Sequence, residues 1–113
     1  MKTENPIVSV VMTVYSDEFY LRPAIDSILN QSFINFEFII VKEFGSDKNT
    51  CNILTEYAEK DTRIKILENT RKLGFAASLN RGIGEATGKY IARMDGDDLS
   101  LRNRLKYQVE FME

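Results

Sequence analysis

The sequence contains no histidine and only one cysteine, Cys51, among its 113 residues. The lack of histidine excludes Ser-His-Asp and Cys-His catalysis and every zinc site that uses a histidine ligand. A single cysteine can form neither an internal disulfide nor a thiolate cluster, and this is typical of a protein of the reducing cytoplasm. We interpret Cys51 as a packing residue. Acid-base or metal chemistry in this chain must therefore rest on carboxylates.

The chain also lacks an excess of basic residues and any long apolar run. Its net charge is -2 with 28% charged residues, which gives no indication of nucleic-acid binding. No apolar stretch approaches the ~20 residues of a transmembrane helix, and the apolar run after residues 1–6 is too short for a signal peptide. We expect one cytoplasmic domain, with peripheral attachment to the inner face of the membrane left open.

Four apolar segments rich in β-branched residues alternate with four segments of helical periodicity. The strands are predicted at residues 7–14, 36–41, 63–67 and 89–94, and the helices at residues 21–29, 53–58, 74–88 and from Ser100 onward. Proline is tolerated in a helix only in the first turn, so Pro23 is expected there in the first helix. Asp47 or Asn49 is available as the N-cap of the second helix. This order predicts an α/β fold, a Rossmann-like, mostly parallel sheet of about four strands with helices on both faces.

The two later helices have predicted apolar faces and boundaries. Gly74 should open the third helix and Gly88 should end it. Its buried face is predicted to consist of Ala76, Leu79, Ile83 and Ala86. The last helix, capped by Ser100, should bury Leu101, Leu105, Val109 and Met112. Ligands of such folds bind at the carboxyl ends of the strands, so residues 13–16, 42–47 and 95–98 are expected to meet there.

An acidic cluster, Asp95-Gly96-Asp97-Asp98, follows the last apolar strand directly. Like charges this close repel, and a divalent cation relieves that repulsion. Asp95 and Asp97 point the same way in an extended backbone, and two carboxylates leave most of the coordination shell of Mg²⁺ or Mn²⁺ open to phosphate oxygens. The alternative is a solvated acidic turn, or Asp98 as a helix cap. An EF-hand is excluded because Leu99, Ser100 and Lys106 occupy its ligand and glycine positions.

Phosphate-binding candidates outside this cluster are basic side chains. The glycine-containing residues 82–89 lack the spacing of a dinucleotide or Walker loop and follow a helix instead of a strand. Arg71, Lys72 and Arg93 could meet phosphate, although each could equally be a solvated surface charge.

Two strand ends carry candidates for contact with a nucleoside. Glu43 or Asp47 could accept hydrogen bonds from a base or ribose, the alternative for Asp47 being a turn and helix cap. Tyr15 could stack on a base, or it could belong to the core.

Several segments, taken in order, resemble the N-terminal, nucleotide-sugar-binding half of family 2 glycosyltransferases with the A-type fold. The matching segments are Pro6 to Ser16, Leu21 to Phe33 with Gln31-Ser32-Phe33, residues 36–41, residues 73–83, residues 86–91 and Met94-Asp95-Gly96-Asp97-Asp98. The last of these resembles the DxD motif of the family. The chain departs from the family pattern at two places. After the second strand the family usually has Asp-Asp-Gly-Ser, where this chain has Lys42-Glu43-Phe44-Gly45-Ser46-Asp47. After the first strand the family usually has Asn, where this chain has Ser16.

The resemblance implies roles for particular residues. Asp95 and Asp97 would hold Mn²⁺ or Mg²⁺ against the diphosphate of a nucleotide sugar, commonly a UDP-sugar. Thr13 and Tyr15 would line the base pocket, and Glu43 could replace the carboxylate that reads uracil. With Lys72, these residues give a predicted nucleotide-sugar-binding set of Thr13, Tyr15, Glu43, Lys72 and Asp95.

The resemblance further implies the donor-binding portion of an inverting glycosyltransferase of hexosyltransferase type. Its acceptor would be a glycan or lipid-linked glycan, and its role polysaccharide biosynthesis at the cell surface. Family members carry their general base beyond the DxD motif, so we expect a chain cut from a longer enzyme, with weak or no transfer by itself. A homodimer is plausible because a truncated sheet exposes an edge. The alternative is a non-catalytic nucleotide- or metal-binding module. A phosphoacceptor domain like that of response regulators is disfavoured, because it would need an acidic pair after the first strand, where Tyr15-Ser16 stands.

Overall fold

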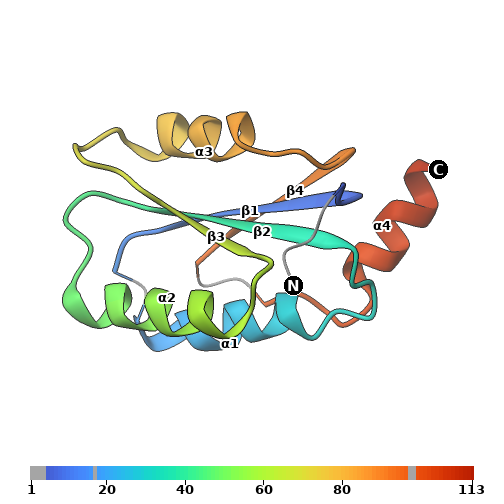
Figure 1. Cartoon of the computed structure of the whole chain (residues 1–113), viewed down its shortest axis with the longest axis horizontal. Coiled ribbons are helices and arrows are strands. Elements are labelled where there is room, and N and C mark those ends of the chain that lie inside the picture. The colour runs from blue at the N-terminus through green and yellow to red at the C-terminus, as the bar shows by residue number, and fades with distance from the viewer. Residues whose placement is uncertain (1–4, 17, 97–98) are drawn as a thin grey trace.

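The computed structural model describes residues 5–16, 18–96 and 99–113, which form a parallel sheet with helices on both faces (Figure 1). The strands are β1 (Val8–Val14), β2 (Phe36–Lys42), β3 (Ile64–Glu68) and β4 (Tyr90–Asp95), in the order β3-β2-β1-β4. The helices are α1 (Glu18–Leu29), α2 (Lys48–Lys60), α3 (Phe75–Gly84) and α4 (Arg104–Met112). The predicted α/β alternation and parallel sheet are confirmed.

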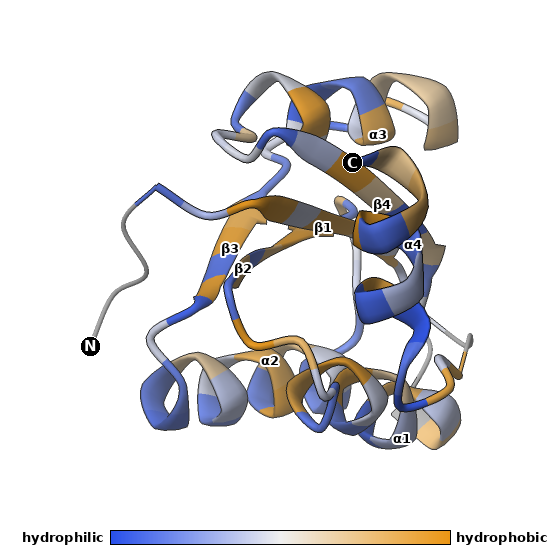
Figure 2. Cartoon of the chain, turned by 90° about the vertical axis from the view of Figure 1, so that its right-hand side faces the viewer, coloured by the Kyte–Doolittle hydropathy of each residue, from blue (hydrophilic) through white to orange (hydrophobic). Residues whose placement is uncertain are grey.

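The two central strands, β1 and β2, are buried on both sides of the sheet because they are apolar at most positions. All seven residues of β1 are buried. Val10 and Met12 join the large core beneath α1 and α2, whereas Val11 joins a smaller core beneath α3. Successive side chains of a strand point to opposite faces, so a continuous apolar run is what two covering layers require. Figure 2 shows these apolar strands between the two helical layers.

The strand order places a topological switch beside β1. The chain proceeds outward from β1 to β2 and β3, and then returns to form β4 on the other side of β1. At this end of the sheet Thr13 lies opposite both Val41 of β2 and Asp95 of β4. Ligand sites of open parallel sheets lie at such a reversal, outside the carboxyl ends of the strands. The fold thus brings residues from three separate parts of the chain to one edge.

Helix α1 begins earlier than predicted, and the expectation for Pro23 was wrong. Because α1 starts at Glu18, Pro23 lies in its second turn, not its first. Proline has no N–H, so it cannot donate to the carbonyl of Phe19 four residues earlier. Pro23 is exposed, so the missing hydrogen bond lies on the solvent side of the helix.

Helix α3 ends at Gly84, four residues before the predicted end at Gly88. The N–H of Gly88 instead donates to Ser9 Oγ over 2.8 Å, which ties the link before β4 to β1. The predicted face was also partly wrong, because Ala76 is exposed while Ser78 and Gly82 are buried. The remaining predicted residues, Leu79, Ile83 and Ala86, do pack on the smaller core.

Helix α4 begins at Arg104 with Asn103 at its N-cap position, so the prediction of a Ser100 cap was wrong. Ser100 N–H donates to Ser27 Oγ over 3.0 Å, and the segment is therefore held against α1 before the helix starts. Leu105 is fully buried and Val109 packs on the large core, as predicted. The other two residues of the predicted face, Leu101 and Met112, are 84% and 58% exposed.

Among the described residues, no helix combines the length and the apolar character needed to cross a bilayer.

Helix α2 begins as predicted at its acidic cap: Asp47 Oδ1 accepts the Thr50 backbone N–H over 2.8 Å. This hydrogen bond lowers the pKa of the Asp47 carboxyl below its ordinary value. The cap interpretation of Asp47 is therefore confirmed.

Candidate functional site

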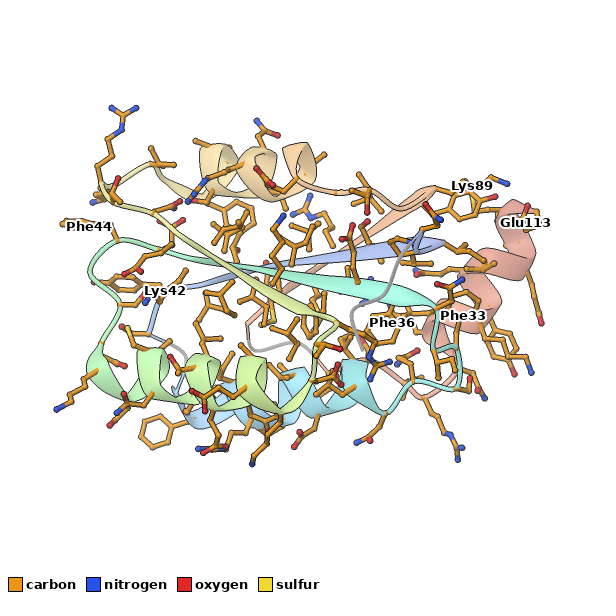
Figure 3. The ribbon with its side chains drawn as sticks, viewed as in Figure 1. Phe33, Phe36, Lys42, Phe44, Lys89 and Glu113 are labelled. Carbon is orange, nitrogen blue, oxygen red and sulfur yellow. The ribbon has the colours of Figure 1, made fainter. Side chains whose placement is uncertain are left out.

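A cavity of about 550 Å³ opens at the carboxyl ends of β1, β2 and β4. It is lined by all five residues of the predicted nucleotide-sugar-binding set, which are Thr13, Tyr15, Glu43, Lys72 and Asp95. Val14, Phe44 and Phe75 also line it. Val14 and Phe44 belong to the segments that were expected to meet at this edge, although not to the predicted binding set, whereas Phe75, the first residue of α3, was not predicted. Figure 3 shows Phe44 at this end of the sheet and the ion pair of Lys89 with Glu113 at the opposite end.

Asp95 reaches the cavity because successive side chains of β4 point to opposite faces of the sheet. Ala92 and Met94 are buried in the large core, so Arg93 and Asp95 point to the other face of the sheet. Asp95 is exposed and, with Gly96, forms part of the cavity wall. Asp97 and Asp98 lie outside the described residues, so the predicted role of Asp97 as a metal ligand stays a prediction.

The donor set of the cavity fits a divalent cation that is shared with a ligand. Among the described residues there is no group of three or more acidic, cysteine or histidine side chains that could hold a metal alone. Mg²⁺, however, is usually bound through one or two carboxylates together with substrate phosphates and water. An exposed carboxylate at Asp95, with the Lys72 ammonium in the same cavity, suits a metal that arrives with a diphosphate.

Glu43 is fixed at the end of β2 by both its backbone and its side chain. Its N–H donates to the Val14 carbonyl over 2.8 Å, which extends the β1–β2 pairing by one step. Its Oε1 accepts the hydroxyl of Ser78 and, over 3.4 Å, the amide of Asn69. Ser78 is 0% and Asn69 3% exposed, so both donors are inside the protein. The Glu43 carboxylate is therefore fixed at the cavity wall by buried hydrogen-bond donors.

Arg81 holds the Asn69 side chain from the side away from Glu43. Its Nη1 donates to Asn69 Oδ1 over 2.6 Å and to the Glu68 carbonyl over 2.9 Å. Asn69 Nδ2 in turn donates to Ser78 Oγ over 2.8 Å. Asn69, Ser78 and Arg81 were not predicted as site residues, because polar residues also surround them in the sequence and nothing there singles them out.

Three aromatic side chains surround the mouth of the cavity and remain partly open to solvent. Tyr15, Phe44 and Phe75 are 55%, 55% and 51% exposed, so the alternative interpretation of Tyr15 as a core residue was wrong. The Tyr15 ring lies against the backbone of Gly45, since a Cβ built there would be 3.7 Å from Tyr15 Cε1. Flat, half-exposed rings beside polar groups suit the stacking of a planar ligand.

The other predicted phosphate candidates are separated by the structure. Lys72 lines the cavity, whereas Arg71 is exposed outside its lining. Arg93 does not line the cavity, and its guanidinium carbon lies 5.8 Å from the centroid of the Phe75 ring. Cys51 is half-buried and its Sγ accepts a hydrogen bond from Lys42 Nζ over 3.4 Å, and its predicted packing role stays a prediction.

Comparison with known proteins gives relatives that span nearly the whole chain. An uncharacterized glycosyltransferase of Methanocaldococcus jannaschii is 45% identical over 111 residues, which are 97% of this chain and 38% of that protein. The Escherichia coli enzyme WfgD, a UDP-Glc:α-D-GlcNAc-diphosphoundecaprenol β-1,3-glucosyltransferase, is 33% identical over 96% of this chain and 42% of its own length. The chain thus spans well under half of these relatives.

Solved structures share the fold. TarS of S. aureus in complex with UDP superimposes with a TM-score of 0.84 at 25% identity, over 99% of this chain and 32% of that one. The mannosyltransferase PcManGT of Pyrobaculum calidifontis, in complex with GDP-Man and Mn²⁺, gives 0.85 at 25% identity, over 97% and 33%. The model of the family described as "Glycosyl transferase family 2" matches residues 9–113. The cavity therefore lies in a chain that belongs to glycosyl transferase family 2.

Proposed function

We propose that this chain is the donor-binding portion of an inverting glycosyltransferase that uses a nucleotide-diphosphate sugar, with a UDP-sugar as its donor. The acceptor is a glycan or a lipid-linked glycan, as the name of the E. coli relative suggests, and the pathway is cell-surface polysaccharide synthesis. Because the chain spans 38% of the first relative, full transfer requires a longer protein.

One observation carries the proposal. A carboxylate that is open to the cavity, Asp95, and a carboxylate held from behind, Glu43, line a single cavity beside the β1–β4 switch. Asp95 and Lys72 suit the diphosphate end of a nucleotide, and Glu43 with Tyr15 suits its base. The cavity thus combines charged groups for a diphosphate with an acceptor carboxylate and an aromatic ring for a base.

Displacement at the anomeric carbon defines what the site must do. The acceptor hydroxyl oxygen forms a bond to that carbon as the bond to the diphosphate breaks, and the electron pair leaves with the diphosphate oxygen. The hydroxyl proton passes to a general base, which we place outside these 113 residues. The negative charge on the departing diphosphate is the electrostatic problem of the reaction. A bound Mn²⁺ or Mg²⁺ would supply Lewis-acid neutralisation of that charge, with Asp95 among its ligands.

Calorimetry with UDP tests the proposal on the chain itself. We expect binding in the presence of Mn²⁺ and at least about tenfold weaker binding after chelation with EDTA. Asp95→Asn should abolish the difference between the two conditions, because the metal-linked part of the affinity depends on that carboxylate. Glu110→Gln, which removes an exposed carboxylate of α4, is the matched control and should behave as wild type.

The absence of any heat with UDP and Mn²⁺ would contradict the proposal. UDP binding that neither EDTA nor Asp95→Asn changes would favour a nucleotide-binding module without transfer chemistry. With a UDP-sugar and an acceptor, we expect the chain alone to bind the donor and to release little or no product.

A further inference from the structure

We infer that Ser78, Asn69 and Arg81 are positioning residues that commit one oxygen of the Glu43 carboxylate, so that a single acceptor oxygen remains for the base and uracil is selected over guanine. The inference rests on the proposed function, because it takes the cavity to hold a nucleotide. The fold leaves the choice of base open, since structures that share it were solved with UDP and with GDP-Man.

The hydrogen bonds behind Glu43 can run in one direction only. Arg81 has donors and no acceptor, so the Asn69 atom that it contacts over 2.6 Å must be the carbonyl oxygen. The Asn69 amide nitrogen therefore faces Ser78 and Glu43. Because Ser78 Oγ accepts from Asn69, its single proton is free to be donated to Glu43 Oε1. The Arg81 guanidinium thus sets the orientation of the Asn69 amide, and the Asn69 amide sets the direction in which the Ser78 hydroxyl donates.

This arrangement saturates one oxygen of Glu43. A carboxylate oxygen offers about two lone-pair sites, and Oε1 receives both the Ser78 hydroxyl and the Asn69 amide. Both donors are inside the protein, so solvent does not compete for them. No hydrogen bond between described side chains ends at Oε2, although Glu43 lines the cavity. The ligand therefore meets one acceptor oxygen instead of two.

The two candidate bases make different demands on that carboxylate. Uracil presents one imide N–H between two carbonyl oxygens, and one acceptor oxygen satisfies it. Guanine presents two parallel donors, its ring N–H and its exocyclic amine, which pair fully only with both oxygens of a carboxylate. With Oε1 committed, one guanine donor would lose its hydrogen bond to water and gain none, and such unpaired groups discriminate strongly between ligands.

The test compares UDP with GDP on the chain by calorimetry in Mn²⁺. Wild type should bind UDP at least about tenfold more tightly than GDP. Ser78→Ala removes one donor, frees a lone pair of Oε1 and lets the carboxylate turn. We expect UDP to bind several-fold more weakly and the UDP-to-GDP ratio to fall by about tenfold.

Two further variants separate positioning from folding. Glu43→Gln should lose UDP affinity, because its carbonyl oxygen would accept the Ser78 hydroxyl and leave the amide NH2 group, a donor that cannot accept the uracil N–H. Ser32→Ala is the matched control, since the hydrogen bonds of Ser32 Oγ within the described part of the chain go to Asn103 and Arg102, away from the cavity lining. Thermal melting of each variant reports the fold, whereas the UDP-to-GDP ratio is a property that loss of stability alone does not change.

The outcomes distinguish the inference from the proposed function. Equal or tighter binding of GDP by wild type, or an unchanged ratio in folded Ser78→Ala, would overturn the inference while the site remained a nucleotide site. Failure of wild type to bind either nucleotide would overturn both.

Discussion

The side-chain carbonyl of Gln31, just after α1, accepts the backbone N–H of Leu105 in the first turn of α4, over 3.0 Å. The amide nitrogen of Gln31 donates to the carbonyls of Leu101, over 2.7 Å, and Ser27, over 3.0 Å. Gln31 is 4% exposed, so these groups have little access to water. One side chain thus anchors the segment that follows the acidic cluster to the first helix.

Replacement of Gln31 should destabilise the protein. Gln31→Ala leaves the buried N–H of Leu105 without its partner, and we expect the free energy of unfolding to fall by about 2 kcal/mol. Urea denaturation measures this change. Asn30→Ala, at the exposed neighbouring position, should have a much smaller effect. Equal stability of the two variants would show that the Gln31 contacts add nothing.

Gly82 permits the close approach of α3 to the sheet. A Cβ at this position would lie 2.5 Å from Val11 Cγ1 and 2.9 Å from Val41 Cγ2. We therefore expect Gly82→Ala to lower the free energy of unfolding by about 1–3 kcal/mol through overpacking. Gly84→Ala on the same helix meets no atom within 4 Å and should be neutral or slightly stabilising, since alanine favours helix. Urea titrations of the two variants should shift in opposite directions or differ clearly; coincident curves would contradict the packing argument.

Asp61 gives a predicted pH dependence. Its side chain accepts hydrogen bonds from Arg63 Nε over 3.0 Å and Nη2 over 2.8 Å, and these bonds lower the pKa of the Asp61 carboxyl below its ordinary value. A lowered pKa in the folded state means that the stabilisation is complete above the unfolded value and is lost as pH falls through the folded one. The melting temperature of Asp61→Asn should thus lie below that of wild type at pH 7, and the gap should narrow as the pH falls below about 3.9, the ordinary pKa of an aspartate.

The control for this prediction is Glu59→Gln, an exposed position of the same helix, α2. Its melting temperature should follow that of wild type at every pH. A gap between wild type and Asp61→Asn that stays constant from pH 7 to pH 2 would mean that the Asp61 charge does not contribute.

Tyr15 is expected to contribute stacking to nucleotide binding. Its ring lines the cavity and is 55% exposed, so it is available to a planar ligand. Base–aromatic stacking is worth about 1–3 kcal/mol, and Tyr15→Ala should weaken UDP binding by about tenfold or more in calorimetry. Tyr20→Ala removes a similarly exposed ring from α1, outside the cavity lining, and should leave the affinity unchanged. Equal affinities of the two variants would remove Tyr15 from the binding site.

Sequence alone determined the α/β architecture and the end of the sheet where the cavity lies. Both follow from local patterns: apolar runs such as residues 8–14 make buried strands, and parallel strands align their carboxyl ends. Strand ends and charge supplied Tyr15, Glu43, Lys72 and Asp95 as candidates, the family resemblance added Thr13 and assigned the roles, and the structure places all five around one cavity. The roles of these residues stay predictions.

Tertiary structure decided the helix boundaries and the surroundings of Glu43. The end of α3 depends on where Gly88 meets Ser9, and the start of α4 on contacts with Gln31, which no periodicity shows. Asn69 and Ser78 lie 26 and 35 residues beyond Glu43 in the chain and meet it only when α3 packs on the sheet. Hydrogen bonds between such distant residues depend on the three-dimensional approach of their elements, so a linear pattern carries no signal for them.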